Sequence, residues 1–458
     1  MDFLKELQKF LLHMAKILRS LELSTPVHMS CMSGIHNSIG VKVALREGAE
    51  RMVFDTKFSQ AEIENLVKCN TGILFEIIAS GGICLFDCYR CRLPHEIHEG
   101  NYKTMCSRSM KTLKSKATIH AYRDFSDINI DLPWYLDKGI YFCKIEGRTR
   151  PPGHISKCIE KLKNTALEHS TPSTYTCDPY KMCSRVRTID HKNRNEFSEI
   201  TNSRVDVCEI IEQLFHNGII DHKTNFWCFP FPATFSCGNM NGWTGSIIND
   251  LMGPPFLPVD SARRKMQWAS PLYTFQSSLD ETLSRMEEMA KHPNVQSLRI
   301  HDIGLLDYAN DLQKEYPVEI VWDRFGWPAR NAVPLPMLEN FLSRSGVQIK
   351  EYGAYQNYRN EIQPEAPYMI LVLPGSLAAM VPPSVNYFDT DDTVFFDGSE
   401  KQYHFIEGLL IEDIVPIEQG KGNANSSARD ISIVISDEKT AQRIGIWITK
   451  VKETEGKI

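Results

Sequence analysis

The residues of this sequence best suited to chemistry are the cysteines of the stretch GGICLFDCYRC, residues 81–91. Cys84, Cys88 and Cys91 follow one another with the spacing C-x3-C-x2-C, and Cys106 comes fifteen residues after Cys91. Thiolates are soft ligands that bind zinc and iron–sulfur clusters. The stretch therefore predicts a metal or cluster site. Its spacing leaves three kinds open: a zinc site, the cluster loop of a radical-SAM enzyme, or an iron–sulfur site of another kind.

Two of these alternatives have specific requirements. C-x3-C-x2-C is the cluster spacing of radical-SAM enzymes, but the residue before Cys91 is Arg90 rather than an aromatic residue, and no glycine-rich segment for S-adenosylmethionine follows. Tetrahedral zinc would suit two close cysteines with a more distant pair. The zinc ligands would be Cys84, Cys88, Cys91 and Cys106, or a set that includes His95 or His98.

Composition indicates an ordinary soluble globular protein. The chain has 458 residues, 42% of them hydrophobic and 24% charged, which on length suggests two to three domains. The formal net charge of -6 argues against a broad basic face that grips long nucleic acid. All thirteen cysteines lie between Cys31 and Cys237. Without a signal peptide, this pattern favours the reducing cytoplasm, with thiols available for metal.

The first 23 residues predict an amphipathic helix. Their apolar residues recur at steps of three and four, and charges such as Lys5 and Glu6 interrupt the stretch, unlike in a signal peptide. We expect this helix to face a core. Since no apolar run elsewhere is long enough, we also expect no membrane span.

The elements that must position the cysteines alternate between short apolar strands and amphipathic helices. The predicted strands are 26–30, 51–54, 73–79, 117–122 and 139–147, and the predicted helices are 37–48, 59–69 and 132–139. Ser59 is a plausible N-cap, with Glu62 completing a capping box. Such alternation is typical of a parallel α/β sheet or barrel, in which chemistry lies on the loops after the strands. The cysteine loop follows the strand at 73–79.

We predict four regions along the chain. Residues 1–165 form a cysteine-bearing, barrel-like α/β region, and residues 166–275 an irregular connector or insertion. Residues 276–383 return to an α/β rhythm, with strands at 295–300, 318–322 and 368–373, and could complete the barrel. Residues 384–458 alternate in steps of two and suggest a small antiparallel, β-rich C-terminal module. The predicted fold is thus α/β and TIM-barrel-like, incomplete or rearranged, with this module attached.

One known family shows the same landmarks in the same order. They are Pro26-Val27-His28, Asn37-Ser38, the C-x6-C pair Cys84 and Cys91, Cys106, and the segment KIEGR at 144–148. Over residues 20–165 the chain resembles the collagenase-like peptidase family of class U, number thirty-two. The resemblance implies a TIM-like barrel with a cysteine-ligated 4Fe-4S cluster. It also implies oxygen-independent hydroxylation in several members, acting on quinone precursors or RNA, with prephenate as the hydroxyl donor in some.

The resemblance also implies site residues. The cluster ligands would be Cys84, Cys91 and Cys106. The family's fourth cysteine would fall near Asn129, where this chain has none, and Cys31, Cys88 and Cys143 are candidates to replace it. Strand alternation puts Cys143 and Glu146 on opposite faces. The usual Arg-Glu after the second strand appears here as Thr56-Lys57.

We therefore expect a cytoplasmic iron–sulfur protein, either a hydroxylase or a modification factor for RNA, a quinone precursor or a peptide. Glu146, Arg148 and His28 would position the substrate at the barrel mouth. The alternatives are a radical-SAM enzyme, a peptidase as the family name implies, or a non-catalytic binding protein stabilised by zinc or a cluster, which would act with a protein partner.

Overall fold

The structure is a computed structural model that describes just over half of the 458 residues. The described residues are 26–31, 33–69, 72–84, 95–98, 101–104, 109–112, 118–120, 122–125, 130–147, 151–168, 221–230, 241–249, 265–323, 349–355, 368–372, 376–380, 392–396, 402–406, 409–412, 430–435 and 438–455. The predicted helix at 1–23 lies outside them.

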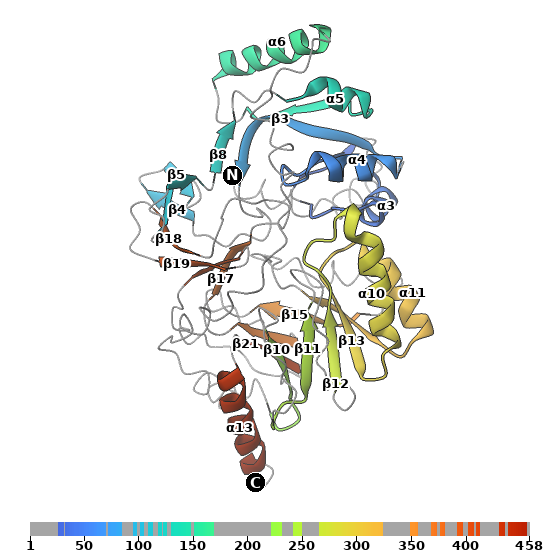
Figure 1. Cartoon of the computed structure of the whole chain (residues 1–458), viewed down its shortest axis with the longest axis vertical. Helices are drawn as coiled ribbons and strands as arrows, with labels where there is room; N and C mark the ends of the chain where they lie inside the picture. The colour runs from blue at the N-terminus through green and yellow to red at the C-terminus, as the bar shows by residue number, and fades with distance from the viewer. Residues whose placement is uncertain are drawn as a thin grey trace. The chain divides into compact units, whose positions relative to one another are not determined.

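The chain forms two compact units. The first comprises residues 1–188, 275–279 and 379–400, and the second comprises residues 189–274, 280–378 and 401–458. Each is described by itself below (Figure 1).

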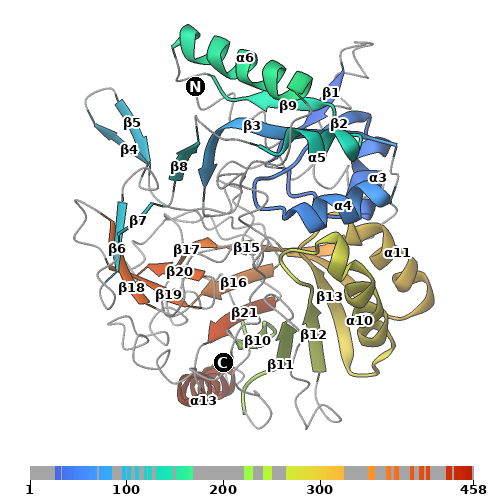
Figure 2. The same ribbon diagram turned by 45° about the horizontal axis from the view of Figure 1, so that its top comes forward.

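The first unit contains a sheet whose main strands run parallel. β1 (Val27–Met29), β2 (Ala49–Val53), β3 (Leu74–Cys84) and β9 (Phe142–Ile145) pair in the order β1-β2-β3-β9, and β8 (Tyr122–Phe125) pairs antiparallel with the end of β3. Figure 2 shows the four parallel strands next to one another. This sheet confirms the predicted alternation of strands and helices in this region.

Helices connect and follow these strands: α3 (Ser38–Arg46), α4 (Gln60–Lys68), α5 (Leu132–Asp137) and α6 (Pro152–Glu168). Asn37 caps α3 by accepting from the N–H of Gly40 at 2.8 Å, and Ser59 caps α4 by accepting from the N–H of Glu62 at 3.1 Å. The Ser59 cap is therefore confirmed. The Glu62 carboxylate instead accepts hydrogen bonds from Ser277, in the segment 275–279 of the same unit.

The two faces of the sheet differ in burial. Met29, Met52 and Ile77, on one face, are at most 1% exposed. On the other face Leu74 is 49% exposed and His28 is also exposed. The first face is the core of the unit, and the second carries the more accessible side chains.

Short antiparallel pairs complete the described strands. β4 (His95–His98) pairs with β5 (Asn101–Thr104), β6 (Ser109–Thr112) pairs with β7 (Thr118–His120) and β18 (Asp392–Phe396), and β19 (Gln402–Ile406) pairs with β20 (Leu409–Glu412). β17 (Ser376–Met380) spans the boundary between the units.

The second unit contains a closed barrel of eight parallel strands. In order around the barrel these are β10 (Asn225–Pro230), β11 (Gly245–Asn249), β12 (Lys265–Ala269), β13 (Val295–Ile300), β14 (Glu319–Asp323), β15 (Ile349–Tyr355), β16 (Tyr368–Val372) and β21 (Asp430–Ile435). β21 closes the barrel by pairing with both β16 and β10. Sequential order, parallel pairing and closure are the arrangement of a TIM-type barrel.

The described helices of this unit are α10 (Leu279–Lys291), which follows the short 3-10 helix η4 (Gln276–Ser278), α11 (Leu305–Glu315) and α13 (Glu438–Glu455). α10 and α11 lie side by side on the outside of the barrel (Figures 1 and 2), where the Tyr308 hydroxyl donates to Glu287 Oε2 at 3.3 Å. Among the helices described, none is long and apolar enough to cross a membrane.

The structure corrects where the barrel lies. We predicted it at 1–165, completed by residues 276–383, whereas the closed barrel uses strands between 225 and 435. Residues 166–275, interpreted as a connector, supply β10, β11 and β12. The stretch WCFPFP resembles a loop because of its prolines and aromatic residues, but Trp227 and Phe229 are buried barrel residues. Short βα units have the same local pattern in an open sheet and in a barrel, and this explains the error.

The predicted β-rich C-terminal module is corrected in its last part only, because β18, β19 and β20 lie within it and pair antiparallel. Residues 430–435 form the eighth barrel strand, and residues 438–455 form a helix. The run RIGIWITK at 443–450 alternates in steps of two, but its buried residues Ile444 and Ile448, together with the preceding Ala441, follow helical spacing instead.

Candidate functional site

The candidate site lies at the carboxyl ends of the parallel strands in the first unit. Loops that follow parallel strands meet at one edge of the sheet, and in α/β proteins this edge carries the chemistry. β2 and β9 both flank β3. We use "carboxyl edge" for the five residues that this pairing gathers there: Asp55, Lys57, Ser80, Gly81 and Glu146.

Glu146 is packed directly against β3. Its N–H donates to the carbonyl oxygen of Ser80 at 2.8 Å, which extends the β3–β9 pairing by one residue. A Cβ atom built on Gly81 would come within 2.6 Å of Glu146 Oε2 and 2.8 Å of its Cγ. The side chain therefore needs a glycine at position 81. The KIEGR segment thus touches β3 three residues before Cys84.

A buried ion pair follows β2 at the same edge. Lys57 Nζ lies 3.0 Å from Asp55 Oδ2, and the backbone N–H of Lys57 donates to Asp55 Oδ1 at 3.1 Å. Asp55 and Lys57 are only 7% and 5% exposed. Buried charges are normally paired in this way, because an isolated one is very costly. In the sequence, Asp55 and Lys57 directly follow a predicted strand, which was a signal for this pair, but we did not predict it.

The predicted cluster ligands are only partly within the described residues. Cys84 is the last residue of β3. Cys88, Cys91, Cys106 and Arg148 lie outside the described residues. In the part of the chain that the structure describes, no three His, Cys, Asp or Glu side chains gather closely enough to hold a metal ion.

The strand register places Cys31 far from Cys84. Met29 pairs with Met52, and Met52 pairs with Phe75, so Cys31 is level with Ile77. Cys84 lies seven residues further along β3, which at ~3.3 Å per residue corresponds to roughly 20 Å in a straight strand. The strand register therefore does not bring the backbone of Cys31 close to that of Cys84.

Cys143 is on the core side of β9. It pairs in register with Ile77, which is fully buried, and alternation puts it on the face opposite Glu146. Burial raises the pKa of the Cys143 thiol to about 11, and the nearby Glu76 carboxylate contributes to the same shift. A metal ligand must be a thiolate, so this environment does not favour Cys143 as a ligand.

His28 and Glu146 do not share one site. His28 is exposed on β1 and level with Leu74, whereas Glu146 is level with Gly81 on β3. The register separates the two levels by seven residues, again roughly 20 Å of straight strand. The site at the carboxyl edge is therefore built around Glu146.

An arginine-centred cluster lies on the same face as His28. Arg51 Nη1 is 3.1 Å from Glu76 Oε2, and the Arg51 guanidinium carbon lies 3.5 Å from the centre of the Phe142 ring. The ion pair and the cation–π contact tie β2, β3 and β9 together across this face. Arg51 and Glu76 were not among the predicted residues.

Thiol contacts behind the edge join α6 to β3. Cys158 Sγ lies 3.5 Å from Ser80 Oγ and 3.4 Å from His154 Nε2.

The described cysteines differ in redox state. Four of them carry no disulfide: Cys31, Cys69, Cys143 and Cys158. Cys228 in β10 is disulfide-bonded, which differs from the free thiols that we expected.

The carboxyl edge thus combines carboxylates, a buried ammonium and the start of a cysteine-rich segment. A carboxylate beside a glycine-lined strand can accept a hydrogen bond from a substrate hydroxyl or N–H, and a lysine can attract an acidic group. The arrangement suits binding and orientation of a polar substrate next to that segment.

Comparison with known proteins identifies one family. Residues 12–199 match the sequence profile described as Peptidase family U32, which contains the whole carboxyl edge and confirms the resemblance of residues 20–165. No curated protein and no solved structure matches the chain.

Proposed function

Because residues 12–199 of the chain belong to peptidase family U32, we propose that the protein is an iron–sulfur enzyme, an oxygen-independent hydroxylase or modification factor for RNA, a quinone precursor or a peptide. The contact between Glu146 and Gly81 is the main support, because it joins the KIEGR segment to the strand that ends in Cys84. Two landmarks far apart in the sequence thereby meet at the edge where α/β proteins carry their chemistry.

The chemistry of the donors fits a 4Fe-4S cluster. We assign Cys84, Cys91 and Cys106 as ligands, with Cys88 as the fourth candidate, because their thiols are close in sequence and begin at the end of a strand. We do not assign Cys31 as a ligand, because the strand register separates it from Cys84. We do not assign Cys143 either, because the pKa of its thiol is raised. A bound cluster would supply one-electron redox chemistry at this edge.

The remaining residues of the edge would bind and orient the substrate. Glu146 would accept a hydrogen bond from a hydroxyl or N–H group of the substrate, and Arg148, two residues later, would bind an acidic group. The Asp55–Lys57 pair would fix the loop after β2 that forms the other side of the site. His28 has no part in this assignment, because the register places it elsewhere.

Anaerobic purification followed by analysis of iron, sulfide and zinc tests the cofactor. We expect about four irons and four sulfides per chain, and large losses in Cys84→Ala, Cys91→Ala and Cys106→Ala. Cys69→Ala is the matched control, because Cys69 is exposed at the end of α4 and carries no disulfide. Iron retained in all three variants would overturn the ligand assignment.

Other outcomes identify the alternatives. Zinc without iron would favour a zinc-stabilised binding protein, and reductive cleavage of added S-adenosylmethionine would favour a radical-SAM enzyme. For the activity itself, RNA, quinones and peptides from anaerobic cells with and without the protein would be compared by mass. We expect one fraction to lose the mass of a single oxygen atom when the protein is absent.

A further inference from the structure

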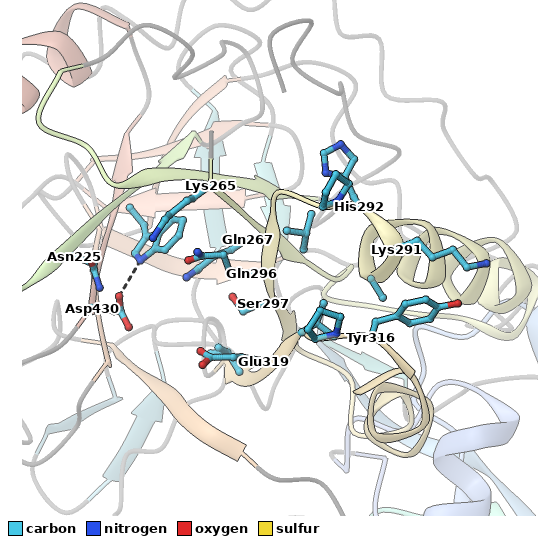
Figure 3. A pocket seen from close by; sticks show the side chains of 17 residues that line it. Asn225, Lys265, Gln267, Lys291, His292, Gln296, Ser297, Tyr316, Glu319 and Asp430 are labelled. Carbon is cyan, nitrogen blue, oxygen red and sulfur yellow. Dashed lines mark hydrogen bonds between the residues drawn. The ribbon is translucent and has the colours of Figure 1, made fainter. Parts of the chain in front are cut away.

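The barrel of the second unit contains a cavity at the end where its strands begin (Figure 3). Its volume is about 450 Å³, in the lower part of the range of small-molecule pockets. The first residues of five strands surround its entrance: Asn225, Lys265, Val295, Glu319 and Asp430. The cavity lies wholly outside residues 12–199, so what it binds does not depend on the function proposed above.

A buried arginine closes the inner end of the cavity. Gln267 and Ser297 line the cavity one level inside its entrance, as alternation along β12 and β13 requires. One level further, the fully buried Arg299 donates to Gln267 Oε1 at 3.0 Å and to Ser432 Oγ at 2.7 Å. These bonds run from β13 to β12 and β21, so the guanidinium group belongs to the charges that surround the cavity.

The charges of the described residues around the cavity balance. Glu319 and Asp430 contribute two carboxylates at the entrance. Lys265 contributes one ammonium group there, and Arg299 contributes one guanidinium group at the inner end. Both carboxylates already interact within the protein, and that of Asp430 accepts from Trp227 Nε1 at 3.0 Å, the bond drawn in Figure 3.

Lys291 also lines the cavity and does not change this balance. Its Nζ lies 2.5 Å from Glu287 Oε1, and the side chain is directed away from the centre of the cavity in Figure 3. A ligand with a net charge would lose its hydration in the cavity without gaining a matching counter-charge, which is costly. The balance therefore favours a molecule without net charge.

The hydroxyl of Ser297 indicates that this molecule is polar. The Ser297 side chain is 1% exposed, and its hydroxyl has no hydrogen-bond partner among the described residues. Buried hydroxyls are almost always hydrogen-bonded in folded proteins. Ser297 lies between Gln267 and Glu319 in Figure 3, so a polar atom of a molecule inside the cavity would supply the partner.

The other polar groups of the lining are of mixed kinds. Asn225 and Gln267 carry amides, the Lys265 ammonium group only donates hydrogen bonds, and the Glu319 carboxylate only accepts them. A hydroxyl group can both donate and accept. Several hydroxyl groups on one small molecule would therefore match this lining without adding charge.

A tryptophan forms an apolar wall beside these groups. A Cβ atom on Gly245 would come within 2.5 Å of the Trp227 ring, so the glycine leaves room for the indole. Val318 and Val321 extend the apolar part of the lining. Such a wall would contact the C–H groups of a ligand ring while the polar groups bond its hydroxyls.

From the balanced charges, the unpartnered Ser297 hydroxyl and the mixed polar lining beside an apolar wall, we propose that the barrel binds a small neutral molecule with several hydroxyl groups, a monosaccharide. One hydroxyl of the sugar bonds Ser297, and others bond the amides of Asn225 and Gln267. The C–H groups of its ring contact Trp227.

Calorimetric titration of the full chain tests the ligand class. D-glucose, D-galactose and D-mannose are compared with the corresponding amino sugars and uronic acids, which keep the ring and add one positive or one negative charge. We expect one neutral sugar to bind with a stoichiometry of one and at least about tenfold more tightly than either of its charged derivatives. Failure of all three neutral sugars to bind at up to about 10 mM, or equal or tighter binding of a charged derivative, would overturn the proposal.

Ser297→Ala then locates the site. Loss of the unpartnered hydroxyl should leave the free energy of unfolding of the ligand-free protein unchanged or higher, whereas the affinity for the sugar should fall about fivefold. Ser156→Ala is the matched control, because Ser156 is exposed on α6 and outside the cavity; it should leave the affinity within about twofold. An affinity that is unchanged in Ser297→Ala would contradict the assignment. The wild-type comparison of neutral and charged sugars decides the ligand class even if the variant does not fold.

Discussion

The carboxylate of Glu146 lies where a side chain at position 81 would have to begin. An ideal Cβ on Gly81 would come within 2.6 Å of Glu146 Oε2 and 2.8 Å of its Cδ. The two residues come from β3 and from the segment after β9, and the hydrogen bond from Glu146 N to Ser80 O holds them in register. A glycine and a carboxylate more than sixty residues apart therefore form one feature of the carboxyl edge.

This relationship predicts a specific coupling between two substitutions. Gly81→Ala should lower the free energy of unfolding by about 1–3 kcal/mol, because the new methyl group overlaps Glu146. In a Glu146→Ala background the same substitution should cost much less, since the overlapping atoms are gone. Denaturant unfolding of the two single variants and the double variant measures the coupling.

Gly153→Ala is the control for this cycle. A Cβ on Gly153 meets nothing within 4 Å, and the residue lies in the first turn of α6, so the substitution should be neutral or slightly stabilising. Additive effects of Gly81→Ala and Glu146→Ala would contradict the close contact on which the proposed function relies.

The thiol of Cys143 should react slowly with alkylating reagents. Burial, aided by Glu76, raises its pKa from 9.0 to about 11, and only the thiolate reacts. Below pH 11 the thiolate fraction falls tenfold per pH unit, so at pH 8 the rate should be roughly a hundredfold below that of a thiol of pKa 9.0. Peptide mapping of iodoacetamide-treated protein between pH 7 and pH 11 should show a rate that rises throughout.

Glu76→Gln separates the two causes of the raised pKa of Cys143, the Glu76 carboxylate and burial. Removal of the carboxylate charge should lower the pKa of Cys143 and shift its rate profile toward lower pH, while the burial of the thiol stays the same. The exposed Cys69 provides the internal comparison and should be labelled first. A Cys143 profile that does not move in Glu76→Gln would contradict the coupling.

The buried Asp55–Lys57 pair should be costly to break. Lys57→Met leaves the Asp55 carboxylate buried without its charge partner and should cost about 3–5 kcal/mol of unfolding free energy. The double variant Asp55→Leu/Lys57→Met should recover a large part of that loss, because no unpaired charge remains. Denaturant unfolding gives both values.

An exposed pair supplies the comparison. Lys314 and Asp311 lie 2.8 Å apart in α11, with side chains 65% and 67% exposed. Lys314→Met should therefore cost less than about 1 kcal/mol. Similar losses for Lys57→Met and Lys314→Met would mean that burial does not strengthen the pair at the carboxyl edge.

Local elements were predictable because their signals lie within a few residues. The strand at 295–300 is β13 with the same bounds, and Ser59 caps α4 as its sequence indicates. The strand that leads to Glu146 was predictable for the same reason, although the prediction of 139–147 extended it past Glu146 whereas β9 ends at Ile145. Alternating apolar residues and capping residues report on their immediate neighbours.

Long-range pairing was not predictable in this way. The barrel closes because Asn225 pairs in register with Asp430, some two hundred residues away, and no local pattern specifies that partner. The cavity depends on the same closure, because it brings Asp430 next to Trp227. The Asp55–Lys57 pair and the Arg51–Glu76 pair likewise required the observed neighbours before their charges could be matched.

The C-terminal helix provides the last test, because its sequence has two periodicities. Ile444, Ile446 and Ile448 alternate as in a strand, but Ile444 and Ile448 are fully buried while Ile446 is 66% exposed, as a helix requires. Ile444→Ala should cost about 2–5 kcal/mol of unfolding free energy. Ile446→Ala is the matched control and should change it by less than about 0.5 kcal/mol. In a strand the three isoleucines would share one face, so equal losses for the two variants in denaturant unfolding would contradict the helix and, with it, the observed end of the barrel.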